Sequence, residues 1–292
     1  MGASKTKKNK IRKTVGIVGL GIMGGAFARN LVADGWRVVG YDISTTRRKE
    51  LAKAGVEIAD DAIAVAAAAP IIITSLPKPE ALMVTAKAIA AAGVPRRVIA
   101  EASTFTIEDK EKAERILRTS GHILLDCPIS GTGSQAKTGD LVIYASGDTK
   151  AIAKVKPVFA GFSRRTYDVG EFGNGSRMKY VANLLVAINN VASAEAMVLG
   201  MKSGLDPRTI FEMISNGAGN SRVFELRAPM MVRNRYDEVT MKCSVWQKDM
   251  DVIGAFARKL KVPTPLFRAT LPVYAAALKR GPDDDTASVC AV

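Results

Sequence analysis

The sequence of 292 residues predicts an α/β domain built on a parallel sheet, followed by an all-α domain, with a long helix joining the two. From residue 14 to about 170, short β-branched runs alternate with longer helical stretches, which is typical of a parallel sheet with helices on both faces. The run Ile71–Ile73 is apolar without alternation, as in a strand that is buried on both faces. From 176 to 203, apolar residues recur at helical spacing, and no strand pattern follows.

The strands of the first domain are bounded by Gly, Pro and Asp. We expect the body of the sheet to consist of Thr14–Gly19, Arg37–Asp42, Ile71–Ser75, Arg97–Glu101 and His122–Cys127, with Asp140–Ser146 and Arg164–Asp168 at its far edge. After the long helix, Pro207 is well placed to open a second one, and helical patterns cover 207–216, 221–233, 244–260 and 265–280. The sequence thus predicts a basic arm at 1–13, the α/β domain at 14–174 and the all-α domain at 175–292.

The composition excludes several kinds of site. The chain has one histidine, His122, and three cysteines, Cys127, Cys243 and Cys290, which are too few and too scattered for a multi-histidine or Cys-rich metal site. We therefore expect no metal. Sparse cysteines in odd number are typical of free thiols in a reducing compartment, so we expect a cytoplasmic protein. No apolar run approaches the roughly 18 residues of a membrane span, so we expect no membrane partner.

The net charge of +14 is unevenly distributed, because six basic and no acidic side chains lie in residues 1–13. The six are Lys5, Lys7, Lys8, Lys10, Arg12 and Lys13, and without them the rest of the chain carries +8. One interpretation of the arm is a segment that binds nucleic acid, a membrane or a targeting receptor. The other is a solvated terminus, which is the default for chain ends. No apolar stretch follows the basic residues, so we expect no secretory signal.

The first strand runs directly into Gly19-Leu20-Gly21-Ile22-Met23-Gly24, and a helix follows. This G-x-G-x-x-G pattern between strand and helix is typical of Rossmann-type dinucleotide-binding domains. The first glycine allows the tight turn, the second lets the backbone approach a pyrophosphate, and the third lets helix and strand pack closely. The N-terminus of the helix offers N–H groups to the phosphates. We therefore expect Gly19, Gly21, Ile22, Met23 and Gly24 to bind a dinucleotide cofactor.

Asp42 ends the second strand, 18 positions after Gly24, close to the spacing expected for a carboxylate that binds a ribose diol. A carboxylate there accepts hydrogen bonds from the 2′-hydroxyl and repels a 2′-phosphate, so Asp42 favours NAD. Arg47 and Arg48 lie a few residues further along and would offset that repulsion, which leaves NADP possible.

Hydride transfer from an alcohol needs a general base for the hydroxyl proton. His122 follows Gly121 at the start of a strand, and we expect it to be structural. A lysine can serve as the base if burial or nearby positive charge lowers its pKa. Lys179, at the start of the long helix, is the candidate, and Asn183 lies on the same helical face four residues later. At this point an exposed, purely structural lysine remains the alternative.

Three further motifs follow the glycine turn along the sequence. They are Asp126-Cys127-Pro128-Ile129-Ser130-Gly131-Thr132, the stretch from Gly173 to Asn183 around Lys179, and Lys248-Asp249. In this order the motifs resemble the β-hydroxyacid dehydrogenase family, and the resemblance runs from about residue 14 to the end of the chain. It implies an oxidoreductase that moves a hydride between the 3-hydroxyl carbon of a small hydroxy acid and NAD or NADP. It also implies that the helical domain serves substrate binding and assembly.

The resemblance implies roles for single residues. Lys179 would be the general acid/base, and Asn183 would hold the substrate beside it. The substrate carboxylate would be bound by Ser130, Gly131 and Thr132, and the cofactor would also be contacted by Leu76, Thr104 and Lys248. Thr132 departs from the family pattern, which is usually Ser-Gly-Gly, and this puts the identity of the substrate in doubt but leaves the reaction type unchanged.

A narrower resemblance lies in 216–221, in Phe224-Glu225 and in 283–287. These stretches are similar to the branch of the family that acts on four-carbon sugar acids, which includes L-threonate dehydrogenase. Asn220 and Ser221 have two interpretations: they would cap the helix that follows, or they would face the substrate.

Two other classes of protein deserve comparison. A non-catalytic protein on the same fold, with the basic arm on nucleic acid or chromatin, would lack the lysine that is present here as Lys179. An imine reductase also typically lacks this lysine. We therefore expect an enzyme, with a small hydroxy acid as its partner and no nucleic acid, and a cationic surface would attract such a substrate. The family resemblance implies an oligomer, and the long helix is apolar, so we expect a homodimer or homotetramer.

Overall fold

The computed structural model describes residues 13–292, so the predicted basic arm, except for Lys13, lies outside the described residues. The described chain divides into two compact units. The first consists of residues up to 103, 108–129 and 135–173, and the second consists of 104–107, 130–134 and 174–292. The division before Asn174 is one residue from the expected boundary. The expected domains were contiguous, so they did not assign the segments 104–107 and 130–134 to the helical unit.

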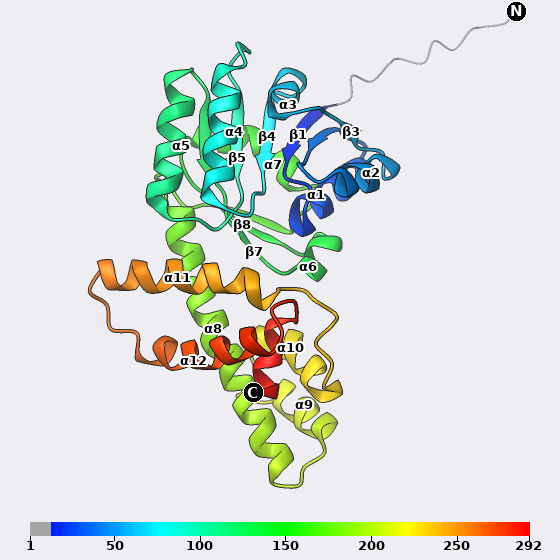
Figure 1. Ribbon diagram of the computed structural model, residues 1–292, viewed down its shortest axis with the longest axis vertical. Coiled ribbons are helices and arrows are strands. Elements are labelled where there is room, and N and C mark those ends of the chain that lie inside the picture. The colour runs from blue at the N-terminus through cyan, green and yellow to red at the C-terminus, as the bar shows by residue number, and fades with distance from the viewer. Residues whose placement is uncertain (1–12) are drawn as a thin grey trace, which may run out of the picture. The chain divides into compact units, whose positions relative to one another are not determined.

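A six-stranded parallel sheet forms the centre of the first unit, with the strand order β3-β2-β1-β4-β5-β6 (Figure 1). The strands are β1 Thr14–Val18, β2 Arg37–Tyr41, β3 Glu57–Ile58, β4 Ile71–Thr74, β5 Val98–Glu101 and β6 Ile123–Asp126. The order reverses between β1 and β4, and ligands of open α/β sheets bind beyond the carboxyl ends of the strands at such a point. The predicted parallel-sheet domain is confirmed.

Five helices connect these strands: α1 Ile22–Ala33, α2 Thr45–Lys53, α3 Ala62–Ala68, α4 Pro79–Ala91 and α5 Ile107–Thr119. Two more, α6 Gly133–Lys137 and α7 Thr149–Phe159, follow later in the same region of the chain. Three of these helices begin at a capping residue. The caps are Ser44, Asp61 and Asp148, and the side chain of each accepts a hydrogen bond from a backbone N–H of the first helical turn. The apolar strand residues Ile17 and Ile73 are fully buried in the core beneath the helices.

Two predicted strands differ from expectation in where they pair. The strands β7 Ile129–Ser130, β8 Val142–Ala145 and β9 Arg165–Asp168 form a separate three-stranded sheet, ordered β7-β8-β9, and do not extend the six-stranded sheet. The last strand of the larger sheet meets this region through an isolated antiparallel bridge between Asp126 and Ser146. β8 and β9 pair in parallel with each other and are only partly buried, so the expectation that they lie at the far edge of the larger sheet is wrong.

The second unit is helical. Its elements are α8 Asn174–Lys202, α9 Pro207–Ser215, α10 Arg222–Arg233, α11 Cys243–Lys259, α12 Pro265–Arg280 and the 3-10 helix η1 Thr286–Ala291. The helices α10, α11, α12 and η1 all pack against α8, which carries the core of the unit. The predicted all-α domain with its long helix is confirmed, whereas η1, whose Ala287 and Val289 are buried, has no counterpart among the predicted helices.

By length and composition, α8 would be long and apolar enough to cross a membrane. A single helix of this kind is weak evidence, since the core helix of a soluble protein passes the same test. The side chain of Asn190 in α8 donates to the hydroxyl of Tyr274 at 3.0 Å and to the carbonyl of Thr286 at 2.9 Å, all within the helical unit. We therefore interpret α8 as the central helix of this unit.

Candidate active site

The glycine turn after β1 has the geometry that a dinucleotide needs. Gly19 has a φ of +94°, and a Cβ there would lie 2.1 Å from the carbonyl oxygen of Ser75. A Cβ at Gly24 would lie 1.9 Å from the carbonyl oxygen of Gly19, whereas a Cβ at Gly21 would meet nothing within 4 Å. The first and third glycines are thus required by packing, and the second leaves open space for a pyrophosphate beside the N-terminus of α1.

The N-terminus of α1 carries no side-chain cap, so Ile22 and Met23 begin the helix beside the open space at Gly21. Asp42 lies next to the same turn. Its Oδ2 accepts a hydrogen bond from the Leu20 N–H at 2.7 Å, and its Oδ1 accepts one from the Ser44 N–H at 2.8 Å. The structure therefore brings the predicted glycine turn and Asp42 together, in an arrangement that fits NAD or NADP.

Leu76 belongs to the same unit and follows β4. Its N–H donates to Ser103 Oγ at 2.8 Å, and the Ser103 N–H donates to Glu101 Oε1 at 2.9 Å. The backbone at Leu76 is thereby attached to the carboxyl end of β5, at the sheet edge that bears the glycine turn. Its placement suits a residue that contacts the cofactor.

A buried ion cluster beneath these loops was not expected from the sequence. The Nζ of Lys110, in α5, lies 2.7 Å from Glu101 Oε2 and 2.7 Å from Asp126 Oδ1, and all three side chains are buried. Burial by itself would lower the pKa of Lys110, but the carboxylates of Asp126 and Glu101 more than offset it and raise that pKa. The available signal was an acidic residue at the last position of two buried strands.

The predicted catalytic lysine lies in the helical unit. Lys179, in α8, is 7% exposed, and Asn183 one turn later is 4% exposed. The Nδ2 of Asn183 donates to Oδ2 of the buried Asp249 in α11 at 2.9 Å. Burial raises the pKa of the Asp249 carboxyl, while the charges of Lys248 and Lys179 and the hydrogen bond from Asn183 oppose that rise. The two facing helices thus bring an amine, an amide and a carboxylate together.

Lys248 precedes Asp249 in α11 and turns toward the segment 104–107. Its Nζ donates to the carbonyl oxygen of Thr104 at 2.7 Å and lies 5.0 Å from the ring centre of Phe105. The hydroxyl of Tyr180 donates to the carbonyl oxygen of Phe105. The predicted cofactor residues therefore fall into two groups: Thr104 and Lys248 lie together in the helical unit, and the others lie in the sheet unit.

The predicted substrate loop, Ser130 to Thr132, also groups with the helical unit. Gly131 has a φ of +140°, and the N–H of Gly133 donates to the carbonyl oxygen of Thr240 at 3.4 Å. Thr240 is itself held by the fully buried Asp285, whose Oδ2 accepts hydrogen bonds from its N–H at 2.7 Å and its hydroxyl at 2.8 Å. The C-terminal segment therefore fixes the backbone against which the loop is placed.

Asp285 also pairs with Arg227 of α10, whose Nη1 lies 2.7 Å from Oδ1 and 2.8 Å from Oδ2. Nearby, Ser221 caps α10 by accepting a hydrogen bond from the Phe224 N–H at 3.0 Å, and Asn220 donates to Glu225 Oε1 at 2.8 Å. Of the two interpretations of Asn220 and Ser221, the structure therefore supports the helix cap.

The remaining candidates have structural roles. His122 is buried, and its Nδ1 accepts a hydrogen bond from the Arg97 N–H at 3.1 Å; burial and the charge of Arg97 lower its pKa. The three cysteines are free thiols, and burial raises the pKa of Cys127 well above its ordinary value. Within residues 13–292 there is no group of three or more His, Cys, Asp or Glu side chains placed to hold a metal ion.

Family models match nearly the whole described chain. Residues 14–170, which are more than half of the chain, match the NAD binding domain of 6-phosphogluconate dehydrogenase. Residues 173–292 match the domain described as NAD-binding of NADP-dependent 3-hydroxyisobutyrate dehydrogenase. The chain belongs to the β-hydroxyacid dehydrogenase family. It is accordingly an NAD(P)-dependent hydroxyacid dehydrogenase, so the predicted family, enzyme class and cofactor are confirmed.

Relatives within the β-hydroxyacid dehydrogenase family align over most of the sequence. The L-threonate dehydrogenase of Cupriavidus necator is 29% identical over 283 residues, with 95% of each chain covered. The 2-(hydroxymethyl)glutarate dehydrogenase of Eubacterium barkeri is 28% identical over 263 residues, with 89% of this chain and 87% of the relative covered. The relatives thus act on different acids, and none is close enough in sequence to fix the substrate.

Solved structures of this family have the same fold. The 3-hydroxyisobutyrate dehydrogenase of Mycobacterium tuberculosis, solved with L-serine, superimposes with a TM-score of 0.86 at 25% identity, covering 96% of this chain and 99% of its own. The enzyme of the same name from Salmonella typhimurium has a TM-score of 0.86 at 26% identity, with the same coverage. An imine reductase from Streptomyces aurantiacus has a TM-score of 0.62 at 20% identity, which shows a shared fold alone.

Proposed function

We propose that the chain oxidises the 3-hydroxyl group of a small hydroxy acid with NAD, and that Lys179 is its general acid/base. The observation that supports this best is the buried cluster of Lys179, Asn183 and Asp249 on α8 and α11. A buried amine beside an amide and a carboxylate whose pKa is shifted is the kind of group that active sites use for proton transfer.

The substrate loop is suited to the carboxylate of the acid. The hydroxyls of Ser130 and Thr132 can donate to carboxylate oxygens, and the positive φ of Gly131 turns the backbone between them. Asn183 has two amide hydrogens, of which Asp249 accepts one. The second would hold the substrate hydroxyl beside Lys179.

The proton moves between this hydroxyl and Lys179. During oxidation the Nζ of Lys179 takes the hydroxyl proton as the carbonyl forms, and during reduction it returns that proton to the oxygen. The carboxylate of Asp249 stabilises the ammonium group that Lys179 becomes. The glycine turn and Asp42 would hold the nicotinamide cofactor, which would accept or supply the hydride at the carbon that bears this hydroxyl. No other general base is required.

Lys179→Met tests the proposal, because it keeps the length of the side chain and removes the amine. We expect kcat to fall about 10²- to 10⁴-fold, which is the usual contribution of a general acid/base, while the dissociation constant for NAD stays unchanged. Lys202→Met is the matched control, since Lys202 is an exposed lysine near the other end of the same helix. Turnover of Lys179→Met within a few-fold of the control would show that another group moves the proton.

NAD is the expected cofactor because of Asp42. Its carboxylate is already oriented by the backbone of the turn, and Arg47 pairs with Glu50 at 3.3 Å while Arg48 donates to Thr45. The two arginines are thus engaged on α2 as surface side chains, which supports NAD over NADP. The ratio of kcat/KM for the two cofactors tests this, and a preference for NADP would contradict it.

The substrate class follows from the family branch. We propose a four-carbon sugar acid such as threonate, supported by the sequence similarity to L-threonate dehydrogenases and by the hydroxyl that Thr132 adds to the loop. One methylene in a pocket is worth only about 1–3 kcal/mol, so the choice needs measurement. A screen of threonate, erythronate, 3-hydroxyisobutyrate, glycerate and 6-phosphogluconate should give the highest kcat/KM for one of the first two acids.

We also propose that the enzyme is a cytoplasmic homodimer or homotetramer. On α8 the apolar side chains of Met178, Val181 and Leu185 are 38%, 53% and 53% exposed and recur at helical spacing, which favours burial against a second copy. Light scattering coupled to gel filtration tests this, and a monomer at micromolar concentration would contradict it.

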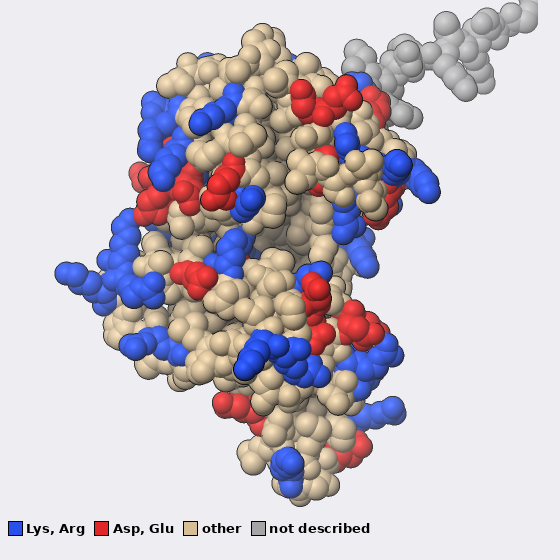
Figure 2. Space-filling model, viewed as in Figure 1, with Lys and Arg blue, Asp and Glu red and all other residues tan. Residues whose placement is uncertain are grey.

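A nucleic-acid function receives no support from the charge on the face of the molecule drawn in Figure 2. On the face drawn in Figure 2, Lys and Arg side chains are interspersed with Asp and Glu and do not gather into a stripe. A stripe of positive charge is what the phosphate backbone requires. We therefore retain the enzyme as the function and do not propose a nucleic-acid partner.

A further inference from the structure

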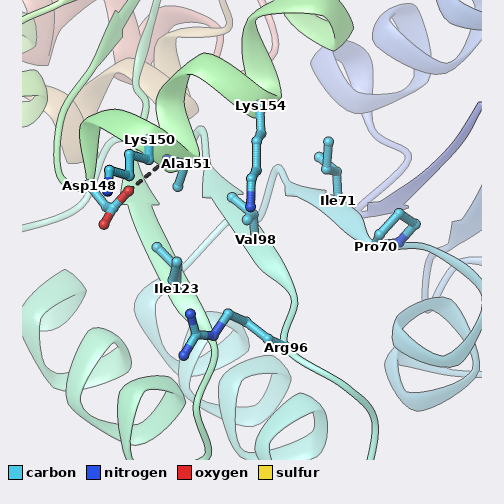
Figure 3. Close-up of a pocket in the computed structure, with 9 residues that line it drawn as sticks. All are labelled: Pro70, Ile71, Arg96, Val98, Ile123, Asp148, Lys150, Ala151 and Lys154. Carbon is cyan, nitrogen blue, oxygen red and sulfur yellow. Dashed lines mark hydrogen bonds between the residues drawn. The ribbon is translucent and has the colours of Figure 1, made fainter.

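A cavity of about 470 Å³ lies at the edge of the six-stranded sheet where β4, β5 and β6 begin (Figure 3). The glycine turn follows the carboxyl end of β1, which in a parallel sheet is the opposite edge. The cavity is therefore separate from the cofactor region of the same unit. Its volume falls in the range of about 300–1,000 Å³ that is usual for small-molecule sites.

The floor of the cavity is apolar. It is formed by Pro70 and Ile71 at the start of β4, by Val98 and Ile123 at the starts of the next two strands, and by Ala151 of α7. Val98 and Ala151 are buried, and Ile71 and Ile123 are half-buried at the margin of the hydrophobic core. A ligand with an apolar body would gain free energy by covering the surface that Pro70, Ile71 and Ile123 still expose.

Three cationic side chains stand around this floor. Arg96 comes from the loop before β5, and Lys150 and Lys154 come from the first turns of α7 (Figure 3). Within the described residues, none of the three forms an ion pair with a carboxylate. Exposed arginines elsewhere on the same unit do form such pairs, as Arg29 does with Glu50 at 2.6 Å.

One carboxylate, Asp148, also lines the cavity and offsets one of the three positive charges, so two remain. Oδ1 of Asp148 accepts a hydrogen bond from the Ala151 N–H at 2.6 Å and caps α7, as the dashed line in Figure 3 shows. Because the helix end is already capped, the preference for an anion comes from the side chains. Lys150 and Lys154 are four residues apart on one helical face, and like charges at that spacing repel each other. An anion between them would relieve the repulsion.

We propose that this cavity is a binding site for an organic anion, with the charged group at Arg96, Lys150 and Lys154 and an apolar body on the strand starts. The site goes beyond hydride transfer and does not depend on it. The ligand class is an organic acid with an aromatic or branched apolar portion, and a plain inorganic anion would use only the rim.

Fluorescence titration with anilinonaphthalene sulfonate tests the site, because this probe joins a sulfonate to an apolar aromatic body. The full chain is titrated with NAD at saturating concentration, so that the probe cannot report on the cofactor region. We expect a saturable component that Lys150→Gln/Lys154→Gln weakens about fivefold to tenfold, since each charge contributes up to about 1 kcal/mol. Lys154→Glu should weaken probe binding more than loss of the Lys154 charge alone, because it replaces a positive charge with a negative one.

The matched control is Lys49→Gln/Lys156→Gln, which makes the same change of charge at two exposed lysines that do not line the cavity. It should bind the probe as the wild type does. Benzoate should displace the probe at lower concentration than acetate or inorganic phosphate, because only benzoate has an aromatic apolar body. Equal weakening in both double variants, or equal displacement by all three anions, would overturn the proposal.

Discussion

The buried ion cluster of Lys110, Glu101 and Asp126 makes a sharp prediction about stability. Lys110→Met removes the ammonium group and leaves two carboxylates, both 0% exposed, without a counter-charge. Removing one partner of a buried ion pair typically costs about 3–5 kcal/mol. Two carboxylates share this lysine, so we expect the loss in the free energy of unfolding to lie at the upper end of that range near neutral pH.

The loss should depend on pH in a defined direction. Without Lys110, the two neighbouring carboxylates repel each other in the folded state, and a proton taken up by one of them removes that repulsion. The folded variant then binds more protons than the unfolded one, so its stability rises as the pH falls. We therefore expect the difference between variant and wild type to shrink between about pH 7 and about pH 5.

Urea denaturation can follow this unit alone. The chain has two tryptophans, Trp36 in the sheet unit and Trp246 in the helical unit, so a Trp246→Phe background leaves Trp36 as the reporter. Lys112→Met is the control, because Lys112 lies in the same helix with its side chain 59% exposed and a weak contact to Asp109 at 3.6 Å. A loss in Lys110→Met within about 1 kcal/mol of that control, or one that does not change with pH, would refute the reasoning.

Three further outcomes are expected. Gly24→Ala should lower both stability and NAD affinity because its Cβ would lie 1.9 Å from a carbonyl oxygen, whereas Gly21→Ala should lower NAD affinity and leave the urea midpoint unchanged. Asp285→Asn should cost about 3–5 kcal/mol by leaving Arg227 buried without a counter-charge, measured as a shift in the transition of the helical unit. Burial lowers the pKa of His122 in the folded state, so the unfolded wild-type chain binds a proton first as the pH falls through about 6.5, and the wild type loses stability. His122→Asn has no such proton to bind and should lose less stability over the same range. Denaturation midpoints of both proteins at two pH values check this.

The sequence predicted each strand of four or five residues, β9 included, and missed the two shortest, β3 and β7. β1 and β4 were visible because they are rich in β-branched residues, while β3 and β7 have two residues each, too few to show a period. The glycine turn was predictable in detail because each glycine has a separate steric reason, and the gaps measured at Gly21 and Gly24 match those reasons.

Contacts between residues far apart in the sequence were harder to predict. Lys110 lies in a charged stretch that is typical of an exposed helical face, and only the fold places it between the ends of β5 and β6. Lys248 and Thr104 are 144 residues apart, so their hydrogen bond has no local signature. Both residues were named through the family resemblance, which supplied positions that periodicity alone does not.

The helical unit is assembled from three pieces of chain, since 104–107 and 130–134 belong to it together with 174–292. A chimaera that joins 174–292 to a foreign dinucleotide-binding domain would therefore receive Lys179 and Asp249 but lose the native Thr104, Ser130 and Thr132. Exchange of cofactor preference between family members is thus best made by grafting loops around Asp42, which belongs to the sheet unit and lies outside those two segments. Single loops can therefore be exchanged between relatives, whereas an exchange of whole halves of the chain would remove residues of the helical unit.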